Sequence, residues 1–176
     1  ALVLGTAARR TLIDDGTIVY LLVKPVPRWK VVLAAMLVAA AATSLLTATA
    51  ALVAGLLVLG LGSPGLLAGM VAGSILGSVL YVVVFVTLSV FTSRALVVGL
   101  GYVLIWEGLV TGFLTGTRIL SIREYALAVV AALGGEGVER AGVDLPVAVA
   151  LSVAVLGIAF ALGAYHLGRF EVGEAA

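Results

Sequence analysis

The sequence predicts an all-α protein, a polytopic bundle of helices that cross a membrane several times within a single domain, residues 1–176. Of its 176 residues, 63% are hydrophobic and only 11% are charged, whereas soluble domains carry about 25% charged residues. The mean hydropathy is +1.30. The apolar residues also form runs longer than the roughly 20 residues that a helix needs to cross a bilayer. Short polar or glycine- and proline-containing segments separate these runs.

The composition also excludes several classes of function. The net charge of +1 gives no basic face for nucleic acid, so we expect no nucleic-acid partner. The absence of cysteine excludes a disulfide framework, a cysteine-ligated zinc site and an iron–sulfur cluster. A single histidine excludes a multi-histidine metal site. Because this histidine, His166, falls at the end of a predicted helix, it leaves no plausible Ser-His-Asp set, and no phosphate-binding loop is present. We therefore expect no catalytic residue, metal or cofactor bound by this chain.

The first eight residues are apolar and lead into Arg9 and Arg10. A signal peptide would carry its basic residues before the apolar stretch, not after it. Eight helical residues extend only about 12 Å, against a hydrocarbon core of roughly 30 Å. We expect residues 1–8 to be the cytoplasmic end of a span whose start is missing; the alternative is a frayed apolar terminus.

Residues 13–30, called the elbow below, form a polar segment just before the chain becomes almost wholly apolar. They carry charges of both signs, a helix-compatible run over residues 16–23, and two prolines, Pro25 and Pro27. Proline fixes φ and disfavours helix in the preceding residue, so the segment is expected to bend at a fixed angle. We interpret it as a surface element that leads into the first complete span; the alternative is a basic juxtamembrane loop.

Apolar runs predict four complete transmembrane helices. The segment 60–65 separates the first two and spells G-x-G-x-x-G, but without a preceding strand this pattern predicts a tight turn and not a dinucleotide site. The four predicted spans cover residues 31–59, 66–91, 95–116 and 146–167.

Small residues recur every four positions in the second and third spans. This spacing places them on one helix face and lets another helix approach closely in lipid; the alternative is a surface that lines a substrate path. The residues that we expect to pack against another helix are Gly69, Gly73, Gly77, Gly108 and Gly112.

Glu107, preceded by Trp106, is the one charge inside a predicted complete span. A carboxylate at the bilayer centre costs about 2.5–3.5 kcal/mol on insertion scales, so we expect it to be protonated, paired or hydrated. Arg94 lies roughly 20 Å away along the same helix, which is too far for an ion pair. Its partner must come from another helix, another subunit or the missing amino-terminal part.

Residues 117–145 form the longest polar interval. Ser121 and Glu124 have the spacing of a capping box, in which the two side chains satisfy free N–H groups at a helix start. Apolar residues then recur on one face until Gly134 and Gly135. We predict a helix over residues 119–135 that lies at the interface or dips into the membrane. Asp144 is expected to cap the last span.

The basic residues predict the orientation. If the spans alternate, seven basic residues fall on one side of the membrane and three, Arg118, Arg123 and Arg140, on the other. The positive-inside rule assigns the first side to the cytoplasm. We therefore expect a multi-pass protein of a prokaryotic cell membrane, with the elbow and the carboxy-terminus in the cytoplasm and residues 60–65 and 117–145 outside.

Two stretches resemble the ABC-2-type transporter permeases, the transmembrane domains of type V exporters. Gly16-Thr-Ile-Val-Tyr-Leu-Leu-Val-Lys-Pro-Val-Pro-Arg-Trp-Lys30 and the apolar run after it are similar to the cytoplasmic link between that family's second and third helices. Arg94-Ala-Leu-Val-Val-Gly-Leu-Gly-Tyr-Val-Leu-Ile-Trp-Glu107, with Tyr125 after Ser121-Ile122, is similar to its fifth helix and gate region. The likeness covers essentially the whole chain. Asp14-Asp15 and Ala34-Ala35 depart from the family pattern, where Glu-x-Glu and Gly-Lys are common.

The resemblance implies a six-helix fold with both termini inside, of which this chain holds the end of helix two and helices three to six. It implies an export subunit without an ATPase site of its own, paired with an ATPase subunit that binds ATP and Mg²⁺, with a second permease copy or paralogue, and with membrane lipid. The gate residues implied are Trp106, Glu107 and Tyr125. The residues implied to couple to the ATPase are Gly16, Thr17, Tyr20, Leu21, Lys24, Pro25, Pro27 and Arg28.

Two other functions fit the same features. One is a non-transporting membrane scaffold or sensor whose external helix binds a ligand. The other is a proton-coupled carrier that uses Glu107.

Overall fold

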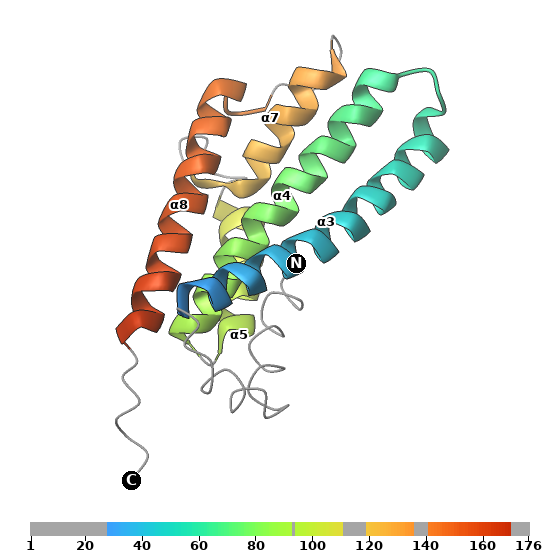
Figure 1. Cartoon of the computed structure of the whole chain (residues 1–176). Helices are drawn as coiled ribbons and strands as arrows, with labels where there is room; N and C mark the ends of the chain where they lie inside the picture. Colours follow the sequence, from blue (N-terminus) through green and yellow to red (C-terminus); the bar gives the residue numbers. More distant parts are fainter. Residues whose placement is uncertain (1–27, 93, 111–118, 136–140, 170–176) are drawn as a thin grey trace.

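The computed structural model describes residues 28–92, 94–110, 119–135 and 141–169, and the elements in these ranges are helices (Figure 1). No strand occurs in the described ranges, which agrees with the predicted all-α class. Three helices are long and apolar enough to cross a membrane, over residues 33–59, 64–91 and 145–163. The elements are α3 (Arg28–Leu59), α4 (Pro64–Phe91), α5 (Ala95–Gly101), η1 (Tyr102–Val110), α7 (Ile122–Gly134) and α8 (Leu145–Arg169).

Helices α3 and α4 form an antiparallel hairpin. The turn needs Gly60, whose φ of +60° lies in the left-handed region that side chains disfavour. Helix α4 then begins at Pro64, two residues before the predicted start. The first turn of a helix tolerates proline because its missing N–H would have no partner there anyway.

Helix α4 is the centre of the bundle and contacts α3, α7 and α8 (Figure 1). Half of the residues in the apolar stretch of α4 are buried, compared with 11% in that of α3 and 17% in that of α8. In lipid such contacts are stabilised by close packing, because lipid tails are as apolar as the side chains. One core cluster joins α3, α4 and α8 through Met36, Ala39, Val82, Val83, Val86 and Ala159. A second joins α4 to the α7–α8 region through Leu80, Ile122, Tyr125, Ala128, Val143 and Ala148.

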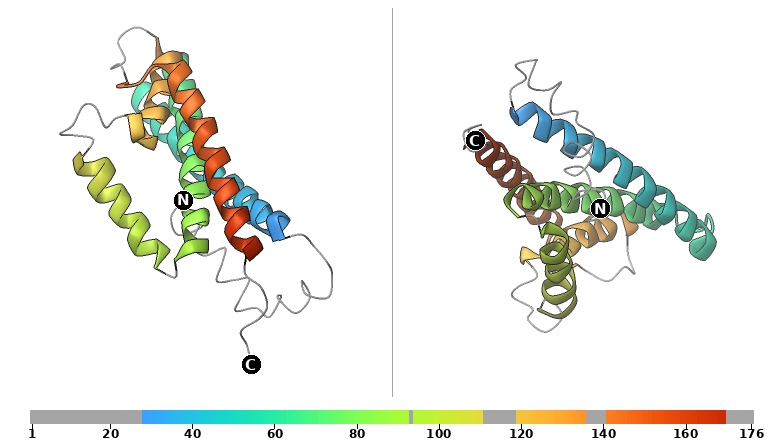
Figure 2. Two further views of the ribbon diagram at one scale, coloured as in Figure 1. Left: turned by 90° about the vertical axis from the view of Figure 1, so that its left-hand side faces the viewer. Right: turned by 90° about the horizontal axis from the view of Figure 1, so that it is seen from below.

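The third predicted span takes a different form. Helix α5 passes directly into η1, a π-helix of nine residues, and the pair diverges from α4 (Figure 2). Its apolar helix, residues 95–108, is shorter than the three long ones. The predicted end at residue 116 lies outside the described residues. Single π-helical turns are common at functional sites, and this one contains Glu107.

The predicted external helix corresponds to α7, which stands beside the first half of α4 and does not lie flat across the bundle (Figure 1). The position of α7 relative to the membrane, at the interface or dipping in, stays a prediction. The start of α3, the α4–α5 junction with Arg94 and the end of α8 share one end of the molecule, called the basic end below. The turn between α3 and α4, the end of α7 and the start of α8 lie at the other end.

The assignment of the basic end to the cytoplasm stays a prediction. Several predicted features lie outside the described residues. These are residues 1–8, Gly112 and most of the elbow, including Gly16, Thr17, Tyr20, Leu21, Lys24, Pro25 and Pro27. Asp144 directly precedes α8, and its carbonyl oxygen accepts the first hydrogen bond of that helix from the Ala148 N–H at 2.9 Å.

Candidate functional site

The carboxylate of Glu107 is buried, with 6% of the residue exposed. The Tyr81 hydroxyl, on α4, donates a hydrogen bond to Oε2. The Ser121 hydroxyl and the Arg123 N–H, at the start of α7, donate to Oε1 at 3.4 Å and 3.3 Å. The first N–H groups of a helix lack partners within it and attract anions. The partners of the acid therefore come from two other helices, as the sequence required, and Arg94 is not among the partners seen here.

The predicted capping box is wrong. Ser121 occupies the N-cap position of α7, but its side chain makes no capping hydrogen bond. Its hydroxyl donates to Glu107 instead, and the Glu124 carboxylate accepts from the Gly142 N–H at 2.8 Å, just before α8. Both side chains therefore join elements that are distant in the sequence.

The two other predicted gate residues flank this network. The Tyr125 hydroxyl donates to the Ile119 carbonyl, and the ring is 2% exposed in the cluster between α4, α7 and α8. The Tyr102 hydroxyl donates to the Leu120 carbonyl at 3.4 Å. The indole nitrogen of Trp106 is buried without a hydrogen-bond partner among the described residues. Residues 119–121 are thus held by tyrosines from both flanking helices.

Glycines of α4 lie against the backbone of α7. A Cβ added at Gly69 would lie 2.9 Å from the Val130 carbonyl oxygen, and one at Gly73 would lie 2.7 Å from the Ala126 carbonyl oxygen. At Gly77 the nearest atom is the Ala126 Cβ, at 3.5 Å. These three residues, called the glycine stripe, allow the two helices to approach closely. Gly108 differs from the prediction, because it is exposed and a Cβ there would meet only its own helix within 4 Å.

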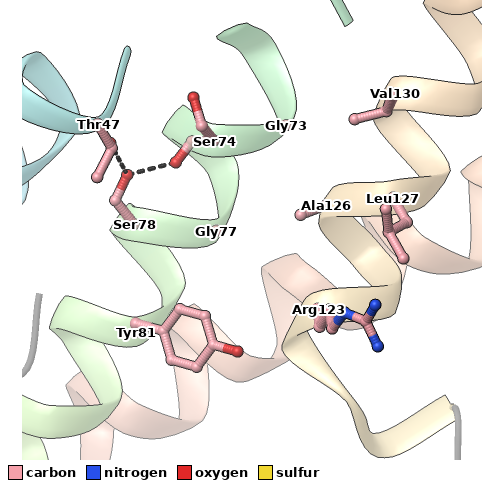
Figure 3. A pocket seen from close by; sticks show the side chains of 10 residues that line it. All are labelled: Thr47, Gly73, Ser74, Gly77, Ser78, Tyr81, Arg123, Ala126, Leu127 and Val130. Carbon is pink, nitrogen blue, oxygen red and sulfur yellow. Dashed lines mark hydrogen bonds between the residues drawn. The ribbon is translucent and has the colours of Figure 1, made fainter. Parts of the chain in front are cut away.

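A groove of about 340 Å³ lies between α3, α4 and α7 (Figure 3). The Thr47 and Ser78 hydroxyls meet at 2.9 Å and join α3 to α4. Tyr81 and Arg123 lie at one end of the groove, and Gly73 and Val130 lie at the other. Its lining residues are Thr47, Gly73, Ser74, Gly77, Ser78, Tyr81, Ala126, Leu127, Val130 and Arg123.

Thr47 and Tyr81 had no predicted role, and Arg123 was counted only among the basic residues of the external side. For Tyr81 there was a usable signal, because it continues the four-residue spacing of the glycine stripe and so lies on the same face of α4. For Thr47 there was none, since a threonine in a membrane helix most often bonds its own backbone, as Thr49 does here.

Replacing Thr47 with valine is expected to lower the free energy of unfolding by about 0.5–1.5 kcal/mol, because hydrogen bonds between membrane helices contribute this much. Unfolding in mixed detergent micelles measures the change. Thr49→Val is the matched control, because the Thr49 hydroxyl is exposed and bonds only to the carbonyls of Leu45 and Leu46. Equal stability of both variants would show that the Thr47–Ser78 bond contributes nothing.

Among the described residues, no group of three or more histidine, cysteine or acidic side chains is placed to hold a metal ion. No family model, curated protein or solved structure matches the chain. The features of the molecule that bear on its function are therefore the Glu107 network, the groove and the arrangement of the helices.

Proposed function

We propose that this chain is the membrane-spanning permease subunit of an ATP-driven exporter of the ABC-2 type. The sequence of residues 16–30 suggests the family, and the structural feature that best supports the proposal is α3. It is one unbroken helix of 32 residues that begins at Arg28, directly after Pro25 and Pro27. Arg28 and Lys30, at the described end of the elbow, are therefore part of a helix long enough to cross the membrane.

The path from α3 to the interior is short. Thr47, in the middle of α3, bonds Ser78 of α4, and the next turn of α4 carries Tyr81, which bonds Glu107. On the other side of α4, the glycine stripe presents no side chains that interlock with α7, and packed helices of this kind can slide by small amounts. A displacement of α3 would thus act on both the groove and the buried acid.

In this proposal the chain works with three kinds of partner. A separate ATPase subunit supplies ATP and Mg²⁺ chemistry, a second permease copy or a paralogue completes the transport path, and membrane lipid surrounds the spans. The site of action is the cell membrane of a prokaryote, with the elbow and carboxy-terminus in the cytoplasm.

The first test is copurification of the full chain from its own cells. We expect a stoichiometric ATPase to remain bound in mild detergent. If the chain is isolated without an ATPase, the export proposal fails and a non-transporting scaffold or sensor is favoured.

Changing Gly16 to valine or Arg28 to glutamate is expected to leave insertion into the membrane intact. Both variants should lower stimulation of the partner ATPase by about tenfold, since each loses a docking contact on the order of 1.4 kcal/mol. Arg94→Gln is the control, because Arg94 lies at the same end of the bundle but between α4 and α5. Unchanged stimulation and transport in both elbow variants would contradict the role of the elbow.

A second candidate, a proton-coupled carrier, is favoured by one observation, namely a buried carboxylate that accepts a hydrogen bond from Tyr81. Purified chain in vesicles with an internal pH indicator distinguishes the two functions. Proton flux without ATP that Glu107→Gln abolishes would favour the carrier. The exporter predicts no such flux in either protein.

A further inference from the structure

The side chain of Arg123 has no direct partner among the residues that the structure describes. Its backbone N–H donates to Glu107, but its guanidinium makes no hydrogen bond or ion pair with any described residue. The Glu107 carboxylate lies within electrostatic range of it, yet it is engaged by Tyr81 and Ser121. Arg123 is exposed and lines one end of the groove (Figure 3).

With the middle of α4 placed at the centre of the bilayer, this guanidinium lies at the depth of the lipid tails. Helix α4 has 28 residues and is about 42 Å long, longer than the roughly 30 Å hydrocarbon core. Tyr81, beside Arg123 at the end of the groove, is ten residues before Phe91, or about 15 Å from the end of α4. An ionisable side chain at this depth is costly and commonly marks a ligand or ion pathway.

The rest of the groove presents an apolar surface to a ligand. The Ser74 hydroxyl donates to the Val71 carbonyl at 2.8 Å, and the Thr47 hydroxyl bonds the Thr43 carbonyl as well as Ser78. The Tyr81 hydroxyl is directed to Glu107. Of the polar side chains that line the groove, the guanidinium alone is therefore available, while Gly73 and Gly77 leave the floor without side chains.

We propose that this groove binds an anionic glycerophospholipid. The phosphate contacts the Arg123 guanidinium, which can donate two parallel hydrogen bonds to it, and one acyl chain lies over Gly73 and Gly77 between α3 and α7. A volume of about 340 Å³ is within the range of ligand sites, about 300–1,000 Å³. Basic pockets between membrane helices are suited to lipid head groups.

A lipid fits better than a soluble anion because the groove opens on the apolar outer face of the bundle. Leu127 lines it and is 37% exposed. A ligand from the bilayer reaches this face laterally, whereas a free phosphate ion would have to cross lipid. The inference goes beyond the export proposal, since it requires the membrane bundle but no ATPase.

The test measures binding of phosphatidylglycerol and phosphatidylcholine to the full purified chain in detergent, by native mass spectrometry. We expect the wild type to hold one phosphatidylglycerol about tenfold more tightly than phosphatidylcholine, because the choline ammonium of the second lipid offsets the phosphate charge that the guanidinium attracts. Arg123→Gln should remove this preference and Arg123→Lys should keep most of it. Arg94→Gln, a basic residue at a helix end, should leave it unchanged.

Gly77→Leu provides a second variant, because its side chain would fill the groove and weaken binding of both lipids. Its control is Gly157→Leu on α8, where a Cβ meets no atom within 4 Å. The proposal is overturned if the wild type does not prefer phosphatidylglycerol, if Arg123→Gln keeps the preference, or if excess inorganic phosphate displaces the lipid. Since no ATPase takes part, failure here is distinct from failure of the export proposal.

Discussion

Replacing Gly73 with leucine is expected to separate α7 from α4 and to destabilise the protein strongly. Even the first added atom would lie 2.7 Å from the Ala126 carbonyl oxygen and 2.8 Å from the Val130 side chain. Backbone atoms of a packed helix move little, so the free energy of unfolding should fall by about 3 kcal/mol, at the upper end of typical overpacking costs. A thermal unfolding curve in detergent, followed by circular dichroism, measures the change.

Gly157→Leu is the matched control for this prediction. Gly157 lies within α8, and a Cβ there would meet no atom within 4 Å. The two variants add the same side chain to a membrane helix, so the difference in their Tm values isolates the helix contact. Equal Tm values would mean that α7 does not lie on the glycine stripe.

Replacing Glu107 with alanine is expected to cost about 3 kcal/mol or more, because it leaves Tyr81, Ser121 and the Arg123 N–H without their acceptor. Each buried donor left unsatisfied costs about 1–3 kcal/mol. Glutamine keeps one carbonyl acceptor, so Glu107→Gln should cost roughly half as much. Denaturant titration of both variants in detergent measures the difference.

Tyr81→Phe adds a further check of this network. It removes one donor and nothing else, so it should cost about 0.5–1.5 kcal/mol. In the double variant Tyr81→Phe/Glu107→Ala the total loss should be smaller than the sum of the two single losses, because each change removes the same hydrogen bond. Strict additivity would contradict the hydrogen bond between these side chains.

The long helices could be predicted from the sequence because length and hydropathy are local properties. α3, α4 and α8 lie where the apolar runs place them, within a few residues at each end. The glycine stripe predicted a close helix contact, but its spacing contains no information about which helix fills it. Gly108 belongs to a pattern with the same spacing and yet is exposed, so the pattern alone does not distinguish a contact from a lipid-facing surface.

The candidate site depends on contacts between residues that are distant in the sequence. Local sequence patterns therefore predicted less of the site than of the helices. The intramembrane acid was visible from its charge, but Tyr81 lies 26 residues away from Glu107 in the sequence. Ser121 and Glu124 have the spacing of a capping box, yet their side chains bond Glu107 and Gly142, which lie 14 and 18 residues away in the sequence. Nothing in the sequence predicted that the segment around Glu107 adopts a π-helix.

In the proposed transporter, the hairpin of α3 and α4 determines how far the middle of α3 moves when its first residues are displaced. The two helices are joined by the short turn at Gly60, at the end of α3 opposite Arg28, and α3 is taken to pivot about this turn. Arg28 is roughly 46 Å from Leu59 along α3, whereas Thr47 is roughly 18 Å from it. If α3 pivots as a rigid rod about this turn, Thr47 moves about two-fifths as far as the elbow. A displacement of several ångströms at the ATPase would then separate Thr47 from Ser78 by a proportionally smaller distance.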